Sequence, residues 1–161
     1  MKKTNTTLIK ILTLVCVALM LAVIVLQFIP FWTVAGEEMS VAEYVWFPEH
    51  HKEATKQFAK DLSIPVKQQA SIVRSAADTH SLVLALSLLG IFFCLTKFGK
   101  GWTSVFPAAA GIIGAIGYFT KPIFQIGSMW YIPGALCAAM AVAGLVILAI
   151  TVIYVLSGDA T

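Results

Sequence analysis

The 161-residue sequence has few charged residues, since only 12% of it is Asp, Glu, Lys or Arg and 59% is apolar. A soluble domain usually carries about 25% charged residues, so this composition excludes an ordinary water-soluble fold. An intrinsically disordered chain needs low hydrophobicity and high net charge, and is excluded as well. The net charge of +3 is too small for a nucleic-acid-binding protein. The composition therefore predicts a small integral membrane protein with a single domain over residues 1–161.

Cysteine is also scarce, and it is absent from the polar segments. The three cysteines, Cys16, Cys94 and Cys137, each lie within an apolar run. An external disulfide framework is therefore excluded, and no two of them have the spacing of a redox or zinc pair. We interpret them as small buried apolar residues.

Four segments are long and apolar enough to cross a bilayer, which requires roughly 20 apolar residues. They cover approximately residues 11–29, 77–96, 102–119 and 131–156. The first has about 19 apolar residues, more than the 7–15 of a signal-peptide core, so we interpret it as an uncleaved signal anchor. The predicted fold is an all-α integral membrane protein. Its four transmembrane helices form a bundle, with a partly helical extracytoplasmic loop between the first two.

The charges around these segments predict that both termini are cytoplasmic. With the N-terminus inside, the cytoplasmic side carries five basic residues and one acidic residue, and the outer side carries six basic and seven acidic residues. Basic residues in short segments near a span end weigh most in setting orientation. Lys2, Lys3 and Lys10 precede the first span, and Lys97 and Lys100 lie in the tight turn after the second. The short cytoplasmic surfaces and the absence of an external disulfide suit a bacterial inner (plasma) membrane.

The third and fourth segments are rich in small side chains spaced four residues apart. In lipid, such spacing lets helix backbones approach closely and drives association. We interpret it as packing of these two helices on each other, and the alternative is an interface with a second copy or a partner subunit. The first two segments carry bulkier side chains and are expected to face lipid. The helix-packing candidates are Ala110, Gly111, Gly114, Ala115, Gly134, Ala138, Ala139 and Ala143.

The loop over residues 33–80 holds seven of the eight acidic residues and contains two helix signals. Ser40 and Glu43 have the spacing of a capping box. Pro48 is predicted to open a second, amphipathic helix that runs to about Leu62 and ends before Ser63-Ile64-Pro65. A second capping-box match, over residues 75–78, places the start of the second span. The apolar face of the amphipathic helix would carry Phe47, His51, Ala54, Phe58 and Leu62.

The same loop concentrates residues suited to binding a partner. Lys52, Lys56 and Lys60 form a basic stripe, and the preceding run contains three aromatic residues. An aromatic anchor beside a charged rim is typical of protein interfaces. The alternative is that the aromatic rings pack on the ends of the spans, and that the helix lies on the bundle or on the lipid surface. The partner-binding candidates are Tyr44, Trp46, Phe47, Lys52, Lys56 and Lys60.

His50 and Glu53 form the nearest approach to a metal site. They are three residues apart, a spacing that places two ligands on one helix face. Two ligands are too few for a structural zinc, and Lys52 between them opposes a cation. We therefore expect no metal and no cofactor.

The layout resembles that of claudin-like four-span proteins, with a long first external loop, a short second one and Trp32 after the first span. The first loop of that family carries a Gly-Leu-Trp segment and a cysteine pair, whereas this loop has Trp46 and no cysteine. The resemblance implies a similar topology and no functional residues.

These patterns favour a non-enzymatic interaction, accessory or scaffold subunit that acts through the external loop. Its expected partners are the lipid bilayer and a membrane protein or second copy, and no nucleic acid. The first alternative is a passive channel or small transporter, as a monomer or an oligomer. The span centres contain no ionisable residue, which argues against a proton-coupled pump but leaves a backbone-lined pore open. A membrane enzyme ranks third, because only His50, His51, His80 and the loop carboxylates could supply acid–base chemistry.

Overall fold

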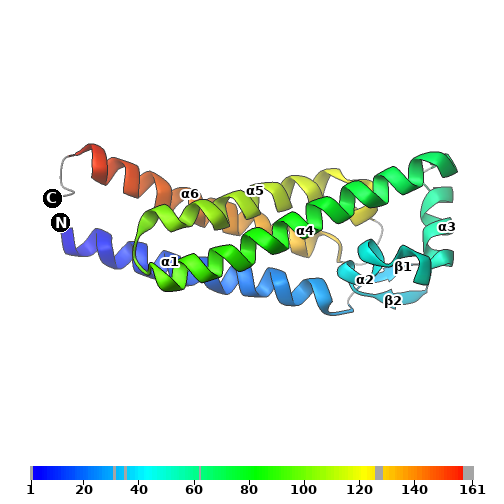
Figure 1. Cartoon of the computed structure of the whole chain (residues 1–161), viewed down its shortest axis with the longest axis horizontal. Helices are drawn as coiled ribbons and strands as arrows, with labels where there is room; N and C mark the ends of the chain where they lie inside the picture. The colour runs from blue at the N-terminus through cyan, green and yellow to red at the C-terminus, as the bar shows by residue number, and fades with distance from the viewer. Residues whose placement is uncertain (1, 31, 35, 62, 126–128, 158–161) are drawn as a thin grey trace.

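The chain folds into an elongated bundle of four long helices (Figure 1), seen in a computed structural model that describes residues 2–30, 32–34, 36–61, 63–125 and 129–157. All four helices are long and apolar enough to cross a membrane, as the sequence predicts. The nearly all-helical architecture is confirmed. The four long helices are α1 (Lys2–Phe28), α4 (Val66–Thr96), α5 (Val105–Thr120) and α6 (Tyr131–Leu156).

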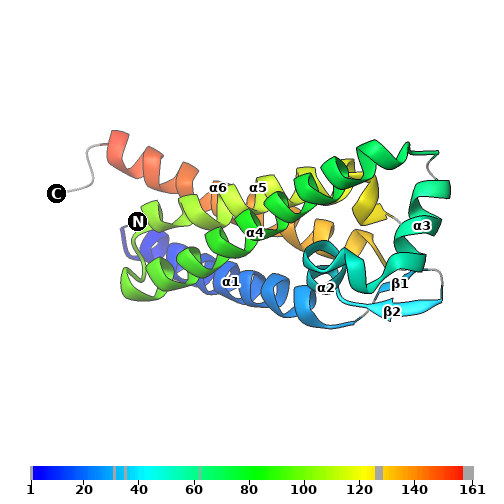
Figure 2. The same cartoon turned by 45° about the vertical axis from the view of Figure 1, so that its right-hand side comes forward.

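The short elements between α1 and α4 gather at one end of the bundle. The segment between α1 and α4 forms a cap of two strands and three short helices. The N-terminal turns of α1 and the C-terminal turns of α6 lie at the opposite end (Figures 1 and 2). Two 3-10 turns, η2 (Gly101–Ser104) and η3 (Pro122–Gln125), flank α5. The cap consists of β1 (Trp32–Val34), β2 (Glu37–Met39), α2 (Val41–Trp46), η1 (Pro48–His50) and α3 (Lys52–Asp61).

The helix that contains the second apolar segment begins well before the predicted start. α4 is continuous from Val66, so the capping-box match at residues 75–78 lies inside the helix and is wrong as a helix start. Pro65 precedes α4 and no helix breaker follows it, so the chain continues as helix into the apolar segment. The Ser75 hydroxyl instead accepts a hydrogen bond of 2.7 Å from the Lys121 ammonium, just after α5. Burial lowers the pKa of Lys121, and nearby Asp78 opposes that shift.

α5 and α6 pack so closely that their backbones touch. A Cβ added to Gly111 would lie 2.6 Å from the Cys137 carbonyl oxygen and closer still to the Ala141 nitrogen. One added to Gly144 would lie 2.7 Å from the Ala108 nitrogen. Small residues thus let these two helices approach to backbone contact, which increases the dispersion attraction between them.

The small residues singled out in the sequence differ in burial. Gly111 and Gly114 are buried on α5, and an added Cβ at Gly114 would lie 2.5 Å from the Cys137 sulfur. Ala139 is exposed on α6, so it makes no close helix contact within one chain. Among the rest, Ala110 and Gly134 are buried, while Ala115, Ala138 and Ala143 are half-buried.

The predicted second loop helix is wrong as a single element, because the chain is interrupted at His51 between η1 and α3. His51 has φ −118° and ψ 54°, outside the helical region. The predicted break after α3 is confirmed, with Ser63 at a φ of 52° and Pro65 preceding α4. Of the expected apolar face, Ala54 is buried, and the Phe58 side chain and Leu62 lie outside the described residues.

The hairpin of β1 and β2 was not expected from the sequence. Its strands pair antiparallel, with Trp32 opposite Met39 and Val34 opposite Glu37. Gly36 in the turn has a φ of +83°, a conformation that favours glycine. Three-residue strands carry too little alternation to be recognised in a sequence.

We predict that Gly111→Ala destabilises the protein, although Gly→Ala inside a helix normally stabilises by about 0.5–1 kcal/mol. The added methyl group meets backbone of α6 that cannot move aside, and overpacking costs typically about 1–3 kcal/mol. Thermal unfolding in mild detergent measures the effect. The control is Gly90→Ala, whose new methyl group meets the flexible Met20 thioether at 2.5 Å. Equal unfolding temperatures for the two variants would contradict the close α5–α6 contact.

Candidate functional site

The cap is fixed to the bundle through α2. The Ser40 side chain caps this helix by accepting a hydrogen bond of 3.1 Å from the Glu43 amide, as the capping-box motif predicts. The next turn buries Val41, Tyr44 and Val45 completely or nearly so. Burial raises the pKa of the Tyr44 phenol above its ordinary value. Tyr44 was a candidate partner-binding residue, and the structure places it in the core below the cap.

His51 ties together three elements of the cap. Its Nδ1 lies 3.2 Å from a Glu37 carboxylate oxygen on β2, and its Nε2 lies 3.2 Å from a Glu43 carboxylate oxygen on α2. The ring is only 11% exposed. The capping-box motif predicts that the Glu43 carboxylate accepts a hydrogen bond from the Ser40 amide. In the structure this carboxylate faces His51 instead. The hairpin, α2 and the start of α3 are held as one unit by these contacts.

Trp46 joins the end of α2 to α4. Its indole N–H donates a hydrogen bond of 3.2 Å to the Ser81 hydroxyl. The indole ring packs edge-on against His80 at a centroid distance of 4.8 Å, and it also contacts Phe28 of α1. By contrast, Phe47 is 48% exposed and stacks on His50. Packing on the bundle, the alternative for the aromatic run, therefore applies to Trp46 and not to Phe47.

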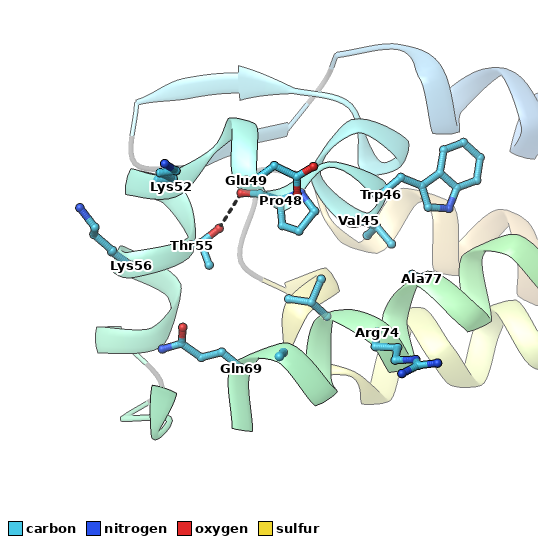
Figure 3. A pocket seen from close by; sticks show the side chains of 12 residues that line it. Val45, Trp46, Pro48, Glu49, Lys52, Thr55, Lys56, Gln69, Arg74 and Ala77 are labelled. Carbon is cyan, nitrogen blue, oxygen red and sulfur yellow. Dashed lines mark hydrogen bonds between the residues drawn. The ribbon is translucent and has the colours of Figure 1, made fainter. Parts of the chain in front are cut away.

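A groove of about 640 Å³ lies between the cap and the projecting part of α4 (Figure 3). Its volume falls within the range of small-molecule binding sites. The walls are mostly apolar, and charged side chains stand along the rim (Figure 3). The cap contributes Val45, Trp46, Pro48, Glu49, Lys52, Thr55 and Lys56, and α4 contributes Gln69, Ala70, Val73, Arg74 and Ala77.

The rim of the groove is predominantly basic, with three cationic side chains and one carboxylate. The Lys56 ammonium is 2.6 Å from the Glu53 carboxylate, and both side chains are 71% exposed, so this pair contributes little to stability. Within the described part of the chain, Lys52 and Arg74 make no ion pair. Two positive charges at the rim are therefore available to a ligand.

The sequence brought only part of this site to attention. Trp46, Lys52 and Lys56 line the groove together, whereas Lys60 lies further along α3 and does not. The α4 wall is not recognised from the sequence, because the loop predicted over residues 33–80 includes residues 66–76. The signal that could have revealed it is the spacing of Ala70, Val73 and Ala77, which repeats on one helix face.

The candidate metal ligands have other neighbours. The His50 ring stacks on Phe47 at 5.6 Å, and the Glu53 carboxylate faces Lys56. Among the described residues there is no group of three or more His, Cys, Asp and Glu side chains that could hold a metal ion.

Beneath Trp46, buried polar side chains lie at the junction of cap and bundle. His80 is fully buried, and its ring nitrogens have no hydrogen-bond partner among the described residues. Gln27 of α1 is also buried and lies beside the Tyr118 hydroxyl of α5. Because Trp46 packs over it, His80 is not available to a substrate at the surface of the cap.

No known protein family, curated protein or solved structure matches this chain.

We predict that Trp46→Ala loosens the cap, at a cost of about 1–3 kcal/mol, less than the 3–5 kcal/mol of a fully buried tryptophan. Trp46→Phe retains the ring contacts with His80 and Phe28 and loses the hydrogen bond to Ser81, so its cost is expected near 1 kcal/mol. Hydrogen exchange of the α2 amides measures both effects. Phe47→Ala is the control, and faster exchange in this variant than in Trp46→Ala would contradict the assignment.

Proposed function

We propose that the four long helices span a membrane with both termini in the cytoplasm and the cap outside. Two observations support this orientation. The N-terminal end of α1 and the C-terminal end of α6 lie at the same end of the bundle, opposite the cap (Figure 1), as an even number of spans requires. Lys97 and Lys100, in the turn after α4, lie at the same end as Lys10. Basic residues close to span ends favour the cytoplasmic side. We further propose that the membrane is a bacterial plasma membrane.

We propose that the protein is a non-enzymatic interaction or accessory subunit that acts through its cap. The groove between the cap and α4 is the observation that carries this proposal. Its walls are held in place by the Trp46–Ser81 hydrogen bond and the His51 contacts, so the groove exists before a ligand arrives. A preformed site avoids much of the entropy cost of ordering loops on binding.

The alternatives receive less support from the geometry. The interior between the four helices is filled by apolar side chains, among them Met20, Val83, Ala110 and Met140, so a pore through one chain would require repacking of the core. An enzyme would need a free histidine beside a cleft, whereas His80 is buried below Trp46, His51 is engaged by two carboxylates and His50 stacks on Phe47.

The orientation predicts opposite labelling of two exposed positions. Lys60→Cys on α3 should react with a membrane-impermeant thiol reagent in intact cells, and Lys97→Cys should react only after the membrane is permeabilised. The unmodified protein is the matched control, because its three cysteines are buried. Labelling of Lys97→Cys in intact cells, with protection of Lys60→Cys, would reverse the proposed orientation.

The role of the cap predicts where the protein is cross-linked in living cells. A photoreactive amino acid placed at Gln69 in the groove should form adducts with a defined mass, since this position faces the proposed ligand. Matched positions at Leu88 on α4 and Val142 on α6 are exposed along the bundle and should contact only bulk lipid. Discrete protein adducts from Leu88 or Val142, with none from Gln69, would place the function in the plane of the membrane instead.

A further inference from the structure

The chemistry of the groove points to the class of ligand it binds, an inference that rests on the proposed function of the cap. The wall formed by α4 is apolar at Ala70, Val73 and Ala77, which lie about one turn apart on one face of the helix. With a rise of 1.5 Å per residue, this stripe is about 10 Å long. Ala77 is the first residue of the predicted second span. The stripe therefore leads from the membrane surface toward the top of the cap.

The wall formed by the cap also changes in polarity along the groove. Trp46 stands at the end of the groove nearest the bundle, and Lys52 and Lys56 stand at the α3 end (Figure 3). Tryptophan favours the headgroup level of a bilayer because it combines an apolar ring with a hydrogen-bond donor. The groove thus has Trp46 and Ala77 at its bundle end, with Arg74 beside them, and the two lysines at its other end (Figure 3).

We propose that the groove holds an anionic phospholipid of the surrounding leaflet. Its acyl chain would lie along Ala70, Val73 and Ala77, and its phosphate would lie at Lys52 and Lys56, which are one turn apart on α3. Lys52 forms no ion pair within the described residues, and the exposed Lys56–Glu53 pair contributes little to stability, so both lysines can donate to phosphate oxygens. The single rim carboxylate, Glu49, leaves the lining with an excess of positive charge.

Two features favour a lipid over a peptide. The walls of the groove are formed by helices, whose backbone groups are hydrogen-bonded internally, so they offer no strand edge to an extended peptide. The apolar stripe is continuous with the predicted membrane surface, from which a lipid chain enters without crossing water. Burial of that chain on apolar side chains supplies the affinity, and the basic rim supplies the preference for an anionic headgroup.

The test uses the purified full-length protein in phosphatidylcholine nanodiscs. In one sample the nanodiscs contain a small share of a phosphatidylglycerol probe that carries a diazirine on its acyl chain. In the other they contain the same share of a phosphatidylcholine probe with the same diazirine chain. After illumination, mass spectrometry locates the labelled residues. We expect the phosphatidylglycerol probe to label residues 70–77 more strongly than the phosphatidylcholine probe, with equal labelling of the bundle around Leu88. Equal labelling of residues 70–77 by both probes would overturn the anionic preference, and no labelling there would overturn the lipid site.

Variants of the rim and the wall sharpen the result. Lys52→Gln and Lys56→Gln should each lower the phosphatidylglycerol labelling about fivefold, the effect of one basic residue near an anionic surface. Lys60→Gln, on α3 but outside the groove, is the matched control and should leave the labelling unchanged. Val73→Trp should fill the groove and abolish labelling of residues 70–77 by both probes. The charge variants keep the proposal testable if Val73→Trp fails to fold, and equal losses in all three glutamine variants would overturn it.

This experiment also separates the lipid proposal from the proposed function. If Gln69 cross-links a protein in cells while the purified protein shows no phosphatidylglycerol preference, the cap remains the binding surface and the lipid proposal is wrong. If Gln69 forms no adduct in cells and residues 70–77 are not labelled in nanodiscs, both proposals are wrong.

Discussion

The length of α4 is the constraint on which the rest of the structure depends. Its 31 residues extend about 46 Å at 1.5 Å per residue, well beyond the roughly 30 Å of a bilayer core. The helix continues past the ends of its neighbours because Pro65 is the last residue before it that can break a helix. The projecting turns provide a rigid wall, and the segment between α1 and α4 folds back against it. Without this wall there would be no groove beside the cap.

The cap is held by a few specific contacts and leaves space below it. Trp46 anchors α2 to α4 by its hydrogen bond and its packing on His80, and His51 joins the hairpin to α2 and α3. α3 carries the lysines of the rim and stands at the end of the groove away from the bundle (Figure 3). The groove exists because α2 packs directly on the bundle whereas α3 stands away from α4. Its apolar walls are formed by side chains that neither element covers.

The two ends of the molecule differ in character. At one end, the short turn between α4 and α5 leaves little surface, and the basic residues there are the ones on which the proposed orientation rests. At the cap end, basic side chains surround an apolar groove, a combination that suits an amphiphilic ligand with an acidic head. The proposed function and the proposed lipid both follow from this combination, since neither a charged patch nor an apolar groove alone would select such a ligand.

The sequence by itself determined the helical class, the four long apolar helices, the Ser40 helix cap and the break before Pro65, because each follows from local periodicity or local hydrogen bonding. Part of the groove was also visible, as the aromatic and basic residues of the loop. Only the tertiary structure decided that α4 begins at Val66, that Trp46 packs on His80 and that Tyr44 is buried. These depend on contacts between residues distant in sequence. A run such as 66–76, with mixed polarity, becomes one wall of a groove only when another segment packs against it.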